Sequence, residues 1–288
     1  MDYPRIISDP VYSVYQSRIE KEVRGYEMPQ HIAVIMDGNR RYAREVLGTD
    51  DTNKGHELGK SKLREVLDWC IDLGIRYLTV YAFSMENFNR DDSEVDYLMD
   101  ILADALTEFA NDDRIHQHRV SIRVIGDCSL LPDHVVKAID FALEKTKGYD
   151  DYHLNLAIAY SGRNDITNAV RGIAKDVVDG KLRIDDIDEN VFGKYVSTFG
   201  LPDPDLVMRT SGEVRISNFL LWQMAYSELY FIDVYWPGFR YIDLLRAIRT
   251  YQQRHRRYGK RPCPAATSYS STPLASTTSA RSRYSTAR

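Results

Sequence analysis

The chain has 288 residues, of which 43% are hydrophobic and 28% are charged, and its formal net charge is −4. Such a length and composition are ordinary for a globular protein with one large domain or two small ones. The slightly acidic balance argues against nucleic-acid binding, which usually requires a basic domain or stripe. An anionic ligand would therefore have to be held by local clusters of basic side chains.

Three observations bear on the compartment of the protein. No apolar run approaches the roughly 18 residues needed to cross a bilayer, and the first residues lack the basic and apolar pattern of a signal peptide. Cys70, Cys128 and Cys263 have neither CxxC nor zinc-ligand spacing, which favours reduced structural thiols. The sequence therefore predicts a cytoplasmic protein.

Apolar residues recur at three- and four-residue steps between residues 10 and 26, which predicts an amphipathic helix. Such a helix can pack on the domain or rest on a membrane surface, and packing is favoured because its polar face is not richly basic. Strands and helices then alternate. The predicted strands span residues 31–35, 76–82, 120–125, 155–160, 205–209 and 229–234, and the predicted helices span residues 55–73, 93–110, 135–147, 165–178, 219–226 and 241–258.

This alternation is typical of βαβ units and predicts an α/β fold with a central, mainly parallel six-stranded sheet and helices on both faces. We expect residues 1–28 to form an N-terminal helix and lead-in, and residues 29–260 to form a single domain. Residues 261–288 include 12 Ser or Thr and no acidic residue, which predicts a disordered tail. Ligands of parallel sheets bind at the carboxyl ends of the strands, so the loops there should carry the chemistry.

The loop after the strand at residues 31–35 combines an acid, a glycine and two arginines. Asp37 at the carboxyl end of a strand could hold a magnesium ion. Gly38 would permit close backbone approach, and Arg40 and Arg41 could grip a diphosphate. The alternative is an ordinary solvated turn.

Two further polar clusters follow predicted strands. Residues 82–90, AFSMENFNR, supply a hydroxyl, a carboxamide and a guanidinium, although a helix-capping loop would look similar. Residues 209–219, RTSGEVRISNF, bring Arg209 and Arg215 to a glycine turn followed by a predicted helix start, where backbone N–H groups favour an anion. Three such clusters make a merely solvated surface a poor explanation.

The phrases HIAVIMDGN, AFSMENFNR, RTSGEVRISNFLLWQ and AYSELYF occur in this order and resemble the cis-prenyltransferase family, whose best-known members are the undecaprenyl diphosphate synthases. The resemblance covers residues 29–260, and DGNRRYA suggests an archaeal member. It implies the parallel-sheet fold of that family and a Mg²⁺-dependent transferase. The DDxxD motif of the all-helical trans-prenyltransferases is absent from the chain.

The family condenses isopentenyl diphosphate repeatedly onto an allylic diphosphate, such as farnesyl or geranylgeranyl diphosphate. A long-chain Z-polyprenyl diphosphate results, a precursor of glycosyl carrier lipid in isoprenoid biosynthesis. Magnesium and arginines would neutralise the departing diphosphate while the allylic cation develops. Two alternatives stay open: a short-chain cis-prenyl diphosphate synthase, and a non-catalytic scaffolding subunit of a prenyltransferase complex.

The resemblance also implies roles for individual residues. Asp37 and Glu228 would hold the metal, and Ser84 and Asn87 would assist proton removal. Serine is a poor base without help, so the departing diphosphate could accept the proton instead. Glu228 could also be a buried acid paired with an arginine, and His56 could simply cap a helix. The substrate-binding residues would be Gly38, Asn39, Arg40, Arg41, Tyr42, His56, Phe83, Glu86, Arg90, Arg209, Arg215, Ser217, Arg257 and Gly259.

The sequence departs from the family pattern near the allylic site. Thr52 stands where an arginine usually precedes the histidine by four residues, and Arg44 or Lys54 are candidates to replace it. Arg40 replaces the usual glycine after Asn39. A proline usually follows Arg90, and the chain has aspartate there.

The resemblance further implies a hydrophobic tunnel that sets product length. Its expected wall is the stripe Leu98, Ile101, Leu102, Ala105 and Phe109, with Val124 and Ile125 opposite, although any amphipathic core helix would carry such a stripe. Arg257, Tyr258 and Gly259 resemble an element that reaches the neighbouring active site in dimers, so a homodimer is expected. A solvated basic helix end is the alternative. Contact with a membrane surface during product release stays open.

Overall fold

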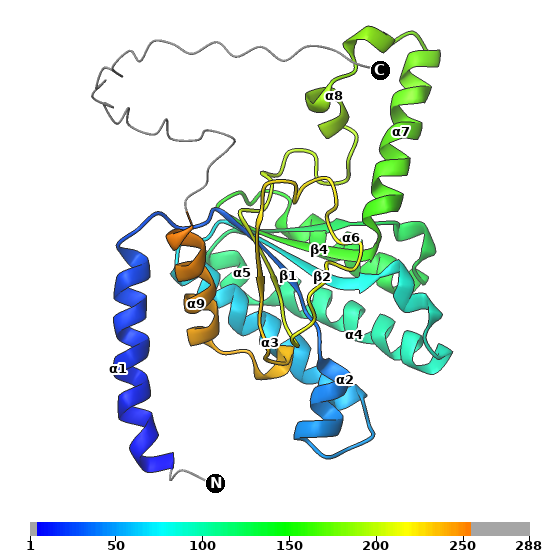
Figure 1. Ribbon diagram of the computed structural model, residues 1–288. Helices are drawn as coiled ribbons and strands as arrows, with labels where there is room; N and C mark the ends of the chain where they lie inside the picture. Colours follow the sequence, from blue (N-terminus) through cyan, green and yellow to red (C-terminus); the bar gives the residue numbers. More distant parts are fainter. Residues whose placement is uncertain (1–4, 255–288) are drawn as a thin grey trace, which may run out of the picture. The chain divides into compact units, whose positions relative to one another are not determined.

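The computed structural model describes residues 5–254, with side chains from Ser13 onward (Figure 1). The predicted element at Arg257 and Gly259 and the tail at residues 261–288 lie outside the described residues. Six strands form one sheet in the order β3-β4-β2-β1-β5-β6, and every neighbouring pair is parallel. The predicted α/β fold with a six-stranded sheet flanked by helices is therefore confirmed.

Each predicted strand occurs within a few residues of its expected place, and so do the long helices apart from residues 219–226. Shorter helical segments were not predicted: α2, α5, α8, the π-helical turn Tyr42–Val46 and the 3₁₀ turn Met85–Asn89. The strands are β1 His31–Ile35, β2 Tyr77–Ser84, β3 Val120–Ile125, β4 Tyr152–Tyr160, β5 Leu206–Arg209 and β6 Glu228–Phe231, and the helices are α1 Arg5–Arg24, α2 Asn39–Arg41, α3 Asn53–Asp72, α4 Asp92–Asn111, α5 Asp113–Gln117, α6 Asp133–Thr146, α7 Gly162–Val178, α8 Glu189–Gly193 and α9 Tyr241–Gln253.

The larger core lies on one face of the sheet. Successive side chains of a strand point to opposite faces, so Ile32 and Val34 of β1 point into this core while Ala33 and Ile35 point away. The helices α3, α4, α6 and α9 contribute many of the other apolar side chains of this core. All five residues of β1 are buried, as a central strand of a parallel sheet requires.

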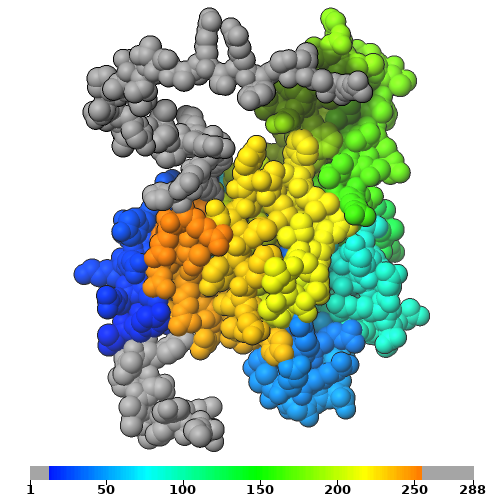
Figure 2. Space-filling view, viewed as in Figure 1, coloured from blue at the N-terminus to red at the C-terminus, as the bar shows by residue number. Residues whose placement is uncertain are grey.

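The opposite face is covered differently from the prediction. Residues 219–226 form successive turns rather than a helix, and Figure 2 shows this yellow segment spread over the front of the domain. Asn218 and Leu220 have φ angles of 62° and 41°, left-handed conformations that a right-handed helix cannot contain. The apolar spacing that suggested a helix instead places Phe219 and Leu220 against the sheet, where both are buried.

The N-terminal helix α1 packs on α9, which confirms the favoured interpretation of its amphipathic pattern. Ile19 and Val23 are fully buried in the main core, and the Arg246 guanidinium of α9 lies 5.5 Å from the ring centroid of Tyr15. Among the described residues, no helix combines the length and apolarity needed to span a membrane.

A buried histidine at the start of β1 makes the fold sensitive to acid. His31 Nδ1 lies 2.7 Å from the Pro202 carbonyl oxygen, and Nε2 lies 2.7 Å from Thr79 Oγ1, which also accepts a hydrogen bond from Asn155. This pattern fits a neutral ring that donates from Nδ1 and accepts at Nε2. Burial lowers the pKa of His31 from 6.5 to about 4.

We expect the free energy of unfolding to fall as the pH drops from 6.5 to 4. In this range the unfolded chain binds a proton at His31 and the folded chain does not, so acid favours unfolding, by about 3 kcal/mol at the lower end. Urea unfolding across this range should show the loss. A His31→Gln variant, whose amide can donate and accept at the same places, should lose less; an unchanged pH dependence would contradict the assignment.

Candidate active site

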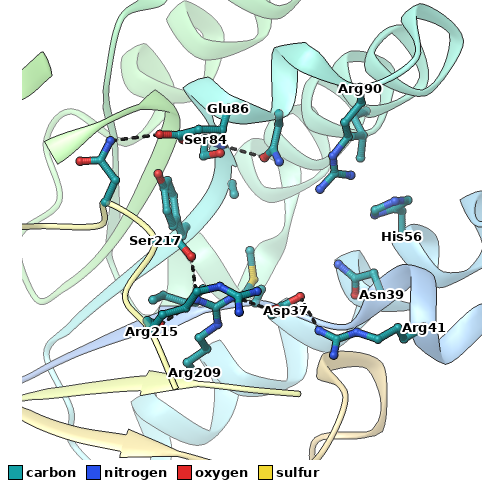
Figure 3. Close-up of a pocket in the computed structure, with 17 residues that line it drawn as sticks. Asp37, Asn39, Arg41, His56, Ser84, Glu86, Arg90, Arg209, Arg215 and Ser217 are labelled. Carbon is teal, nitrogen blue, oxygen red and sulfur yellow. Dashed lines mark hydrogen bonds and ion pairs between the residues drawn. The ribbon is translucent and has the colours of Figure 1, made fainter. Parts of the chain in front are cut away.

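A polar cleft of about 520 Å³ opens at the carboxyl ends of the central strands. The strands β2, β1 and β5 are neighbours in the sheet, so the loops that follow them meet at the carboxyl ends of the strands, where the chemistry was expected. Figure 3 shows Asp37 between Arg209 and Arg41, with Ser84, Glu86 and Arg90 across the cleft. The predicted site residues that line it are Asp37, Asn39, Arg41, His56, Ser84, Glu86, Asn87, Arg90, Arg209, Arg215 and Ser217.

Asp37 is held between two arginines at the floor of the cleft. Its Oδ2 accepts a hydrogen bond of 2.7 Å from Arg209 Nη2, and its Oδ1 lies 3.3 Å from Arg41 Nη2. Partial burial alone would raise the pKa of the Asp37 carboxyl, but the hydrogen bonds and charges of the arginines outweigh it and lower the pKa. The carboxylate is therefore ionised at neutral pH.

Gly38, which follows Asp37, occupies a position whose backbone conformation and close neighbours only glycine fits. Its φ angle is +100°, and a Cβ atom would lie 2.6 Å from Tyr235 Cδ1 and 3.0 Å from Ser211 Cβ. Gly38 does not line the cleft itself. Gly38 was predicted to allow close backbone approach. In the structure the atoms that approach it are those of Tyr235 and Ser211.

A Gly38→Ala substitution should destabilise the protein and disturb the site together. The added methyl group must displace Tyr235 or Ser211, and the left-handed backbone is strained for alanine, at a combined cost of about 2 to 4 kcal/mol. Gly48→Ala is the matched control, because Gly48 has a φ of +65° but no atom within 4 Å of the added Cβ. Thermal unfolding and activity should separate the two variants, and equal losses would contradict the packing argument.

Asn39 packs closely against α3 at Gly55 and Gly59, two glycines to which the sequence analysis gave no role. A Cβ at Gly55 would lie 2.1 Å from the Asn39 carbonyl oxygen, and one at Gly59 would lie 2.6 Å from Asn39 Oδ1. The four-residue spacing of these glycines on one helix face was the available signal. Asn39 Oδ1 is buried without a hydrogen-bond partner.

One acid from α4 lies close to two arginines and a histidine beside the cleft. Glu94 Oε1 lies 2.8 Å from Arg90 Nη1 and 3.5 Å from His56 Nε2, while its Oε2 lies 3.6 Å from Arg40 Nη1. Burial, followed by the charge of Arg90, lowers the pKa of His56, so its ring is neutral at pH 7. The sequence analysis missed Glu94, although its position four residues after Arg90 in a first helical turn was a usable signal.

The loop after β2 is both a cap and a cleft wall. Asn87 Oδ1 accepts a hydrogen bond of 2.9 Å from the Ser84 backbone N–H, so the capping alternative describes the local structure correctly. Asn218 joins this loop to the third motif, since its Nδ2 donates to Glu86 Oε1 at 3.1 Å and to Ser161 Oγ at 2.7 Å. The sequence assigned Asn218 no role.

In the third motif, Arg209 organises the loop that follows it. Arg209 is 4% exposed, and its Nη1 donates to the Arg215 carbonyl oxygen and to Ser217 Oγ, both at 2.7 Å. The buried guanidinium thereby fixes the hydroxyl of Ser217 and the backbone of Arg215, while the Arg215 side chain is 59% exposed at the cleft.

An apolar cavity of about 80 Å³ adjoins the cleft and shares Met36, Asn39 and Leu98 with it. The predicted stripe of α4 lines this cavity. The opposite wall is not Val124 and Ile125, as predicted, because β3 is the edge strand farthest from β1. The wall comes instead from α3, β2 and β4 through Leu63, Phe83 and Leu156, so Phe83 lines the apolar cavity rather than the polar cleft.

Within the chain, the structure does not bring together Asp37 and Glu228, the predicted metal pair. Glu228 begins β6 and pairs in register with Leu206, at the amino end of the sheet, whereas Asp37 follows the carboxyl end of β1. Its carboxylate instead lies 2.5 Å from Arg254 Nη1, which matches the alternative of an acid paired with an arginine. Reading Glu228 as the start of a parallel strand would have placed it correctly.

Several other predicted residues lie beside the cleft rather than in it. Tyr42 starts the π-helical turn and packs near Gly238. Arg40 pairs with Glu94 and does not line the cleft itself. Neither Arg44 nor Lys54 lines the cleft, so neither occupies the place of the arginine that Thr52 replaces.

The parallel sheet, the arginine-rich cleft and the adjoining apolar cavity define a protein suited to an anionic group with a hydrocarbon tail. The chain belongs to the prenyltransferase family of undecaprenyl diphosphate synthases, whose family model matches residues 35–259. Similar curated proteins come from archaea. The proteins of Thermoplasma volcanium and Methanopyrus kandleri are both named tritrans,polycis-undecaprenyl-diphosphate synthase (geranylgeranyl-diphosphate specific).

These alignments cover nearly whole chains. The Thermoplasma volcanium protein is 49% identical over 88% of this chain and 98% of its own length, and the Methanopyrus kandleri protein is 52% identical over 89% and 94%. The solved lavandulyl diphosphate synthase of Lavandula x intermedia, in complex with dimethylallyl diphosphate, has a TM-score of 0.76 and 38% identity over 83% of this chain and 100% of that one. A probable undecaprenyl diphosphate synthase of Campylobacter jejuni has a TM-score of 0.65 and 33% identity over 81% and 99%.

Proposed function

We propose that this protein is a Mg²⁺-dependent cis-prenyltransferase. It condenses isopentenyl diphosphate repeatedly onto an allylic diphosphate, farnesyl or geranylgeranyl diphosphate, and yields a long-chain Z-polyprenyl diphosphate that serves as glycosyl carrier lipid precursor. The observation that carries this proposal is one cleft in which arginines surround an ionised carboxylate and which continues into an apolar cavity. Diphosphate and hydrocarbon parts of a substrate each find a matching surface.

The two diphosphates would occupy opposite sides of the cleft. Asn39 and His56 line both the cleft and the apolar cavity, and Arg41 lines the cleft, an arrangement that suits the allylic diphosphate with its long tail. Arg209, Arg215 and Ser217 lie on the other side of Asp37 and suit isopentenyl diphosphate. Arginine's planar fork matches phosphate oxygens on both sides.

The residues present fit a magnesium ion. Mg²⁺ prefers one or two carboxylates together with substrate phosphates and water, and Asp37 is one ionised, partly exposed carboxylate between the two anion-binding sides. Within residues 5–254, no group of three or more acidic, histidine or cysteine side chains could replace this arrangement. Bound there, the ion would neutralise the leaving diphosphate.

Proton removal and primer choice are also part of the proposal. Ser84 lies across the cleft from Arg215, Asn87 lines the same cleft, and the two would orient the proton that is lost from the isopentenyl unit. We expect geranylgeranyl diphosphate to be the best primer, because similar archaeal proteins are named for that specificity.

We further propose that the protein is a cytoplasmic homodimer with peripheral membrane contact during product release. Large apolar side chains are exposed, among them Val214, Phe199 and Tyr226, whose exposed fractions are 75%, 56% and 78%. A second copy of the chain would cover such a surface, and Arg257 and Gly259 would then belong to the neighbouring site. Light scattering of the purified protein measures the assembly.

The decisive experiment is incubation of the protein with Mg²⁺, labelled isopentenyl diphosphate and primers of ten to twenty carbons. Long Z-polyprenyl diphosphates are expected, with the longest primer used best, and chelation of the metal should stop elongation. Products of one or two additions would instead identify a short-chain synthase. An absence of elongation with every primer would refute the proposal and favour the non-catalytic scaffold.

A further inference from the structure

Glu213 lies between two arginines that belong to opposite sides of the cleft. Its Oε1 lies 3.1 Å from Arg41 Nη1, and its Oε2 lies 2.5 Å from Arg215 Nη1. Under the proposed function, Arg41 contacts the allylic diphosphate and Arg215 contacts isopentenyl diphosphate. A single carboxylate therefore pairs with a cation from each of the two anion-binding sides.

Charges alternate along the cleft as a result. Successive ion pairs join Arg209, Asp37, Arg41, Glu213 and Arg215 in this order. The first and last residues are also in contact, because Arg209 Nη1 donates a hydrogen bond to the Arg215 carbonyl oxygen. Three cations and two anions leave one net positive charge, where removal of Glu213 would leave two. An incoming diphosphate must therefore compete with a carboxylate that already occupies its guanidinium partners.

The backbone keeps Glu213 at this place. Ser211 and Gly212 have φ angles of 74° and 73°, and their N–H groups donate to the Val234 and Ile232 carbonyl oxygens at 2.8 and 2.9 Å. This turn is tied to the segment that follows β6. The backbone position of Glu213 therefore does not depend on its ion pairs with the arginines.

Arg41 does not require Glu213 for its position. Its Nη2 donates to Ser211 Oγ at 2.7 Å and lies near Asp37, and its guanidinium lies 5.7 Å from the ring centroid of Tyr235. The Arg215 side chain is 59% exposed and therefore has room to turn between Glu213 and a ligand. These contacts favour competition for the arginines over support of them as the role of Glu213.

We propose that Glu213 is a resident anion, a carboxylate that occupies Arg41 and Arg215 in the empty cleft and competes with diphosphate for them. The inference rests on the proposed function for its consequence. Every condensation leaves one inorganic diphosphate in the cleft, which must depart before the next cycle. When diphosphate dissociates, Glu213 re-forms its ion pairs with the arginines, which lowers the affinity for the product and speeds its release.

The test is a calorimetric titration of the full-length protein with inorganic diphosphate in the presence of Mg²⁺, which measures the affinity for diphosphate. A Glu213→Gln variant should bind diphosphate about five- to tenfold more tightly than the wild type, with a smaller difference at high salt. Glu144→Gln is the matched control, because Glu144 pairs with Lys147 on exposed α6 and loses the same charge. That variant should bind as the wild type does.

Kinetics gives a second readout that a merely structural role would not produce. In Glu213→Gln, the KM for isopentenyl diphosphate and the inhibition constant of inorganic diphosphate should both fall, and kcat should fall with them because product leaves slowly. Equal or weaker diphosphate binding by the variant would overturn the proposal and make Glu213 a support for the arginines. Diphosphate binding by a wild type that elongates no primer would refute the proposed function, while the calorimetric comparison would still decide the role of Glu213.

Discussion

An Asp37→Asn variant is expected to lose prenyl transfer by about a thousandfold while retaining its fold and its affinity for diphosphate. The amide keeps the shape of the side chain and can still accept a hydrogen bond from Arg209, which is itself held by Ser217 and the Arg215 carbonyl. The charge that would hold Mg²⁺ at the leaving group is lost. The two arginines, freed of a counter-ion, should bind diphosphate at least as well as before.

The measurement is the split between kcat and KM with isopentenyl and geranylgeranyl diphosphates, together with calorimetric titration of inorganic diphosphate. Asp140→Asn on the exposed side of α6 is the control for the loss of one acidic charge. A fall confined to kcat would support a metal-related role for Asp37. Retention of a tenth or more of the wild-type kcat would contradict it, and a loss of diphosphate binding would indicate that Asp37 only positions the arginines.

The parallel sheet could be predicted because its strands are short apolar runs and most of them are followed by a helix with a clear apolar stripe. Such local patterns are decided by residues close in sequence, as at β1 and α3. Residues 219–226 show where this reasoning fails, since their apolar spacing also suits turns that pack on a sheet. The backbone conformations of Asn218 and Leu220 depend on the sheet beneath them.

The site follows a similar division. Arginines and acids at strand ends could be expected to meet once the strand order placed β2, β1 and β5 side by side. Spacing alone could have paired Glu94 with Arg90. The contacts of Glu94 with His56 and of Glu213 with Arg41 could not be expected, because those partners lie far away in the sequence. Glu228 was expected beside Asp37 because its motif matches the family pattern. The motif does not show at which end of its strand a residue lies, and Glu228 lies at the amino end of β6.

The size of the apolar cavity also leads to a prediction about the hydrocarbon tail. A cavity of about 80 Å³ is smaller than the roughly 150 Å³ that accommodates one benzene molecule, so α3 and α4 must separate to admit a long chain. Ala105 lines this cavity and leaves the room into which the tail would grow. The size of the side chain at this position should therefore limit the length of the primer and of the product.

An Ala105→Phe variant is expected to shorten the product and to lower kcat/KM with geranylgeranyl diphosphate by about ten- to a hundredfold, through overpacking of the cavity. Dimethylallyl diphosphate, whose tail is short, should be affected much less. Ala103→Phe is the matched control, because Ala103 is half-buried on the same helix, packs against the main core and does not line the cavity. Product chromatography and the ratio of kcat/KM for the two primers measure the effect. Equal losses with both primers, or the same loss in the control, would mean that the tail does not pass Ala105.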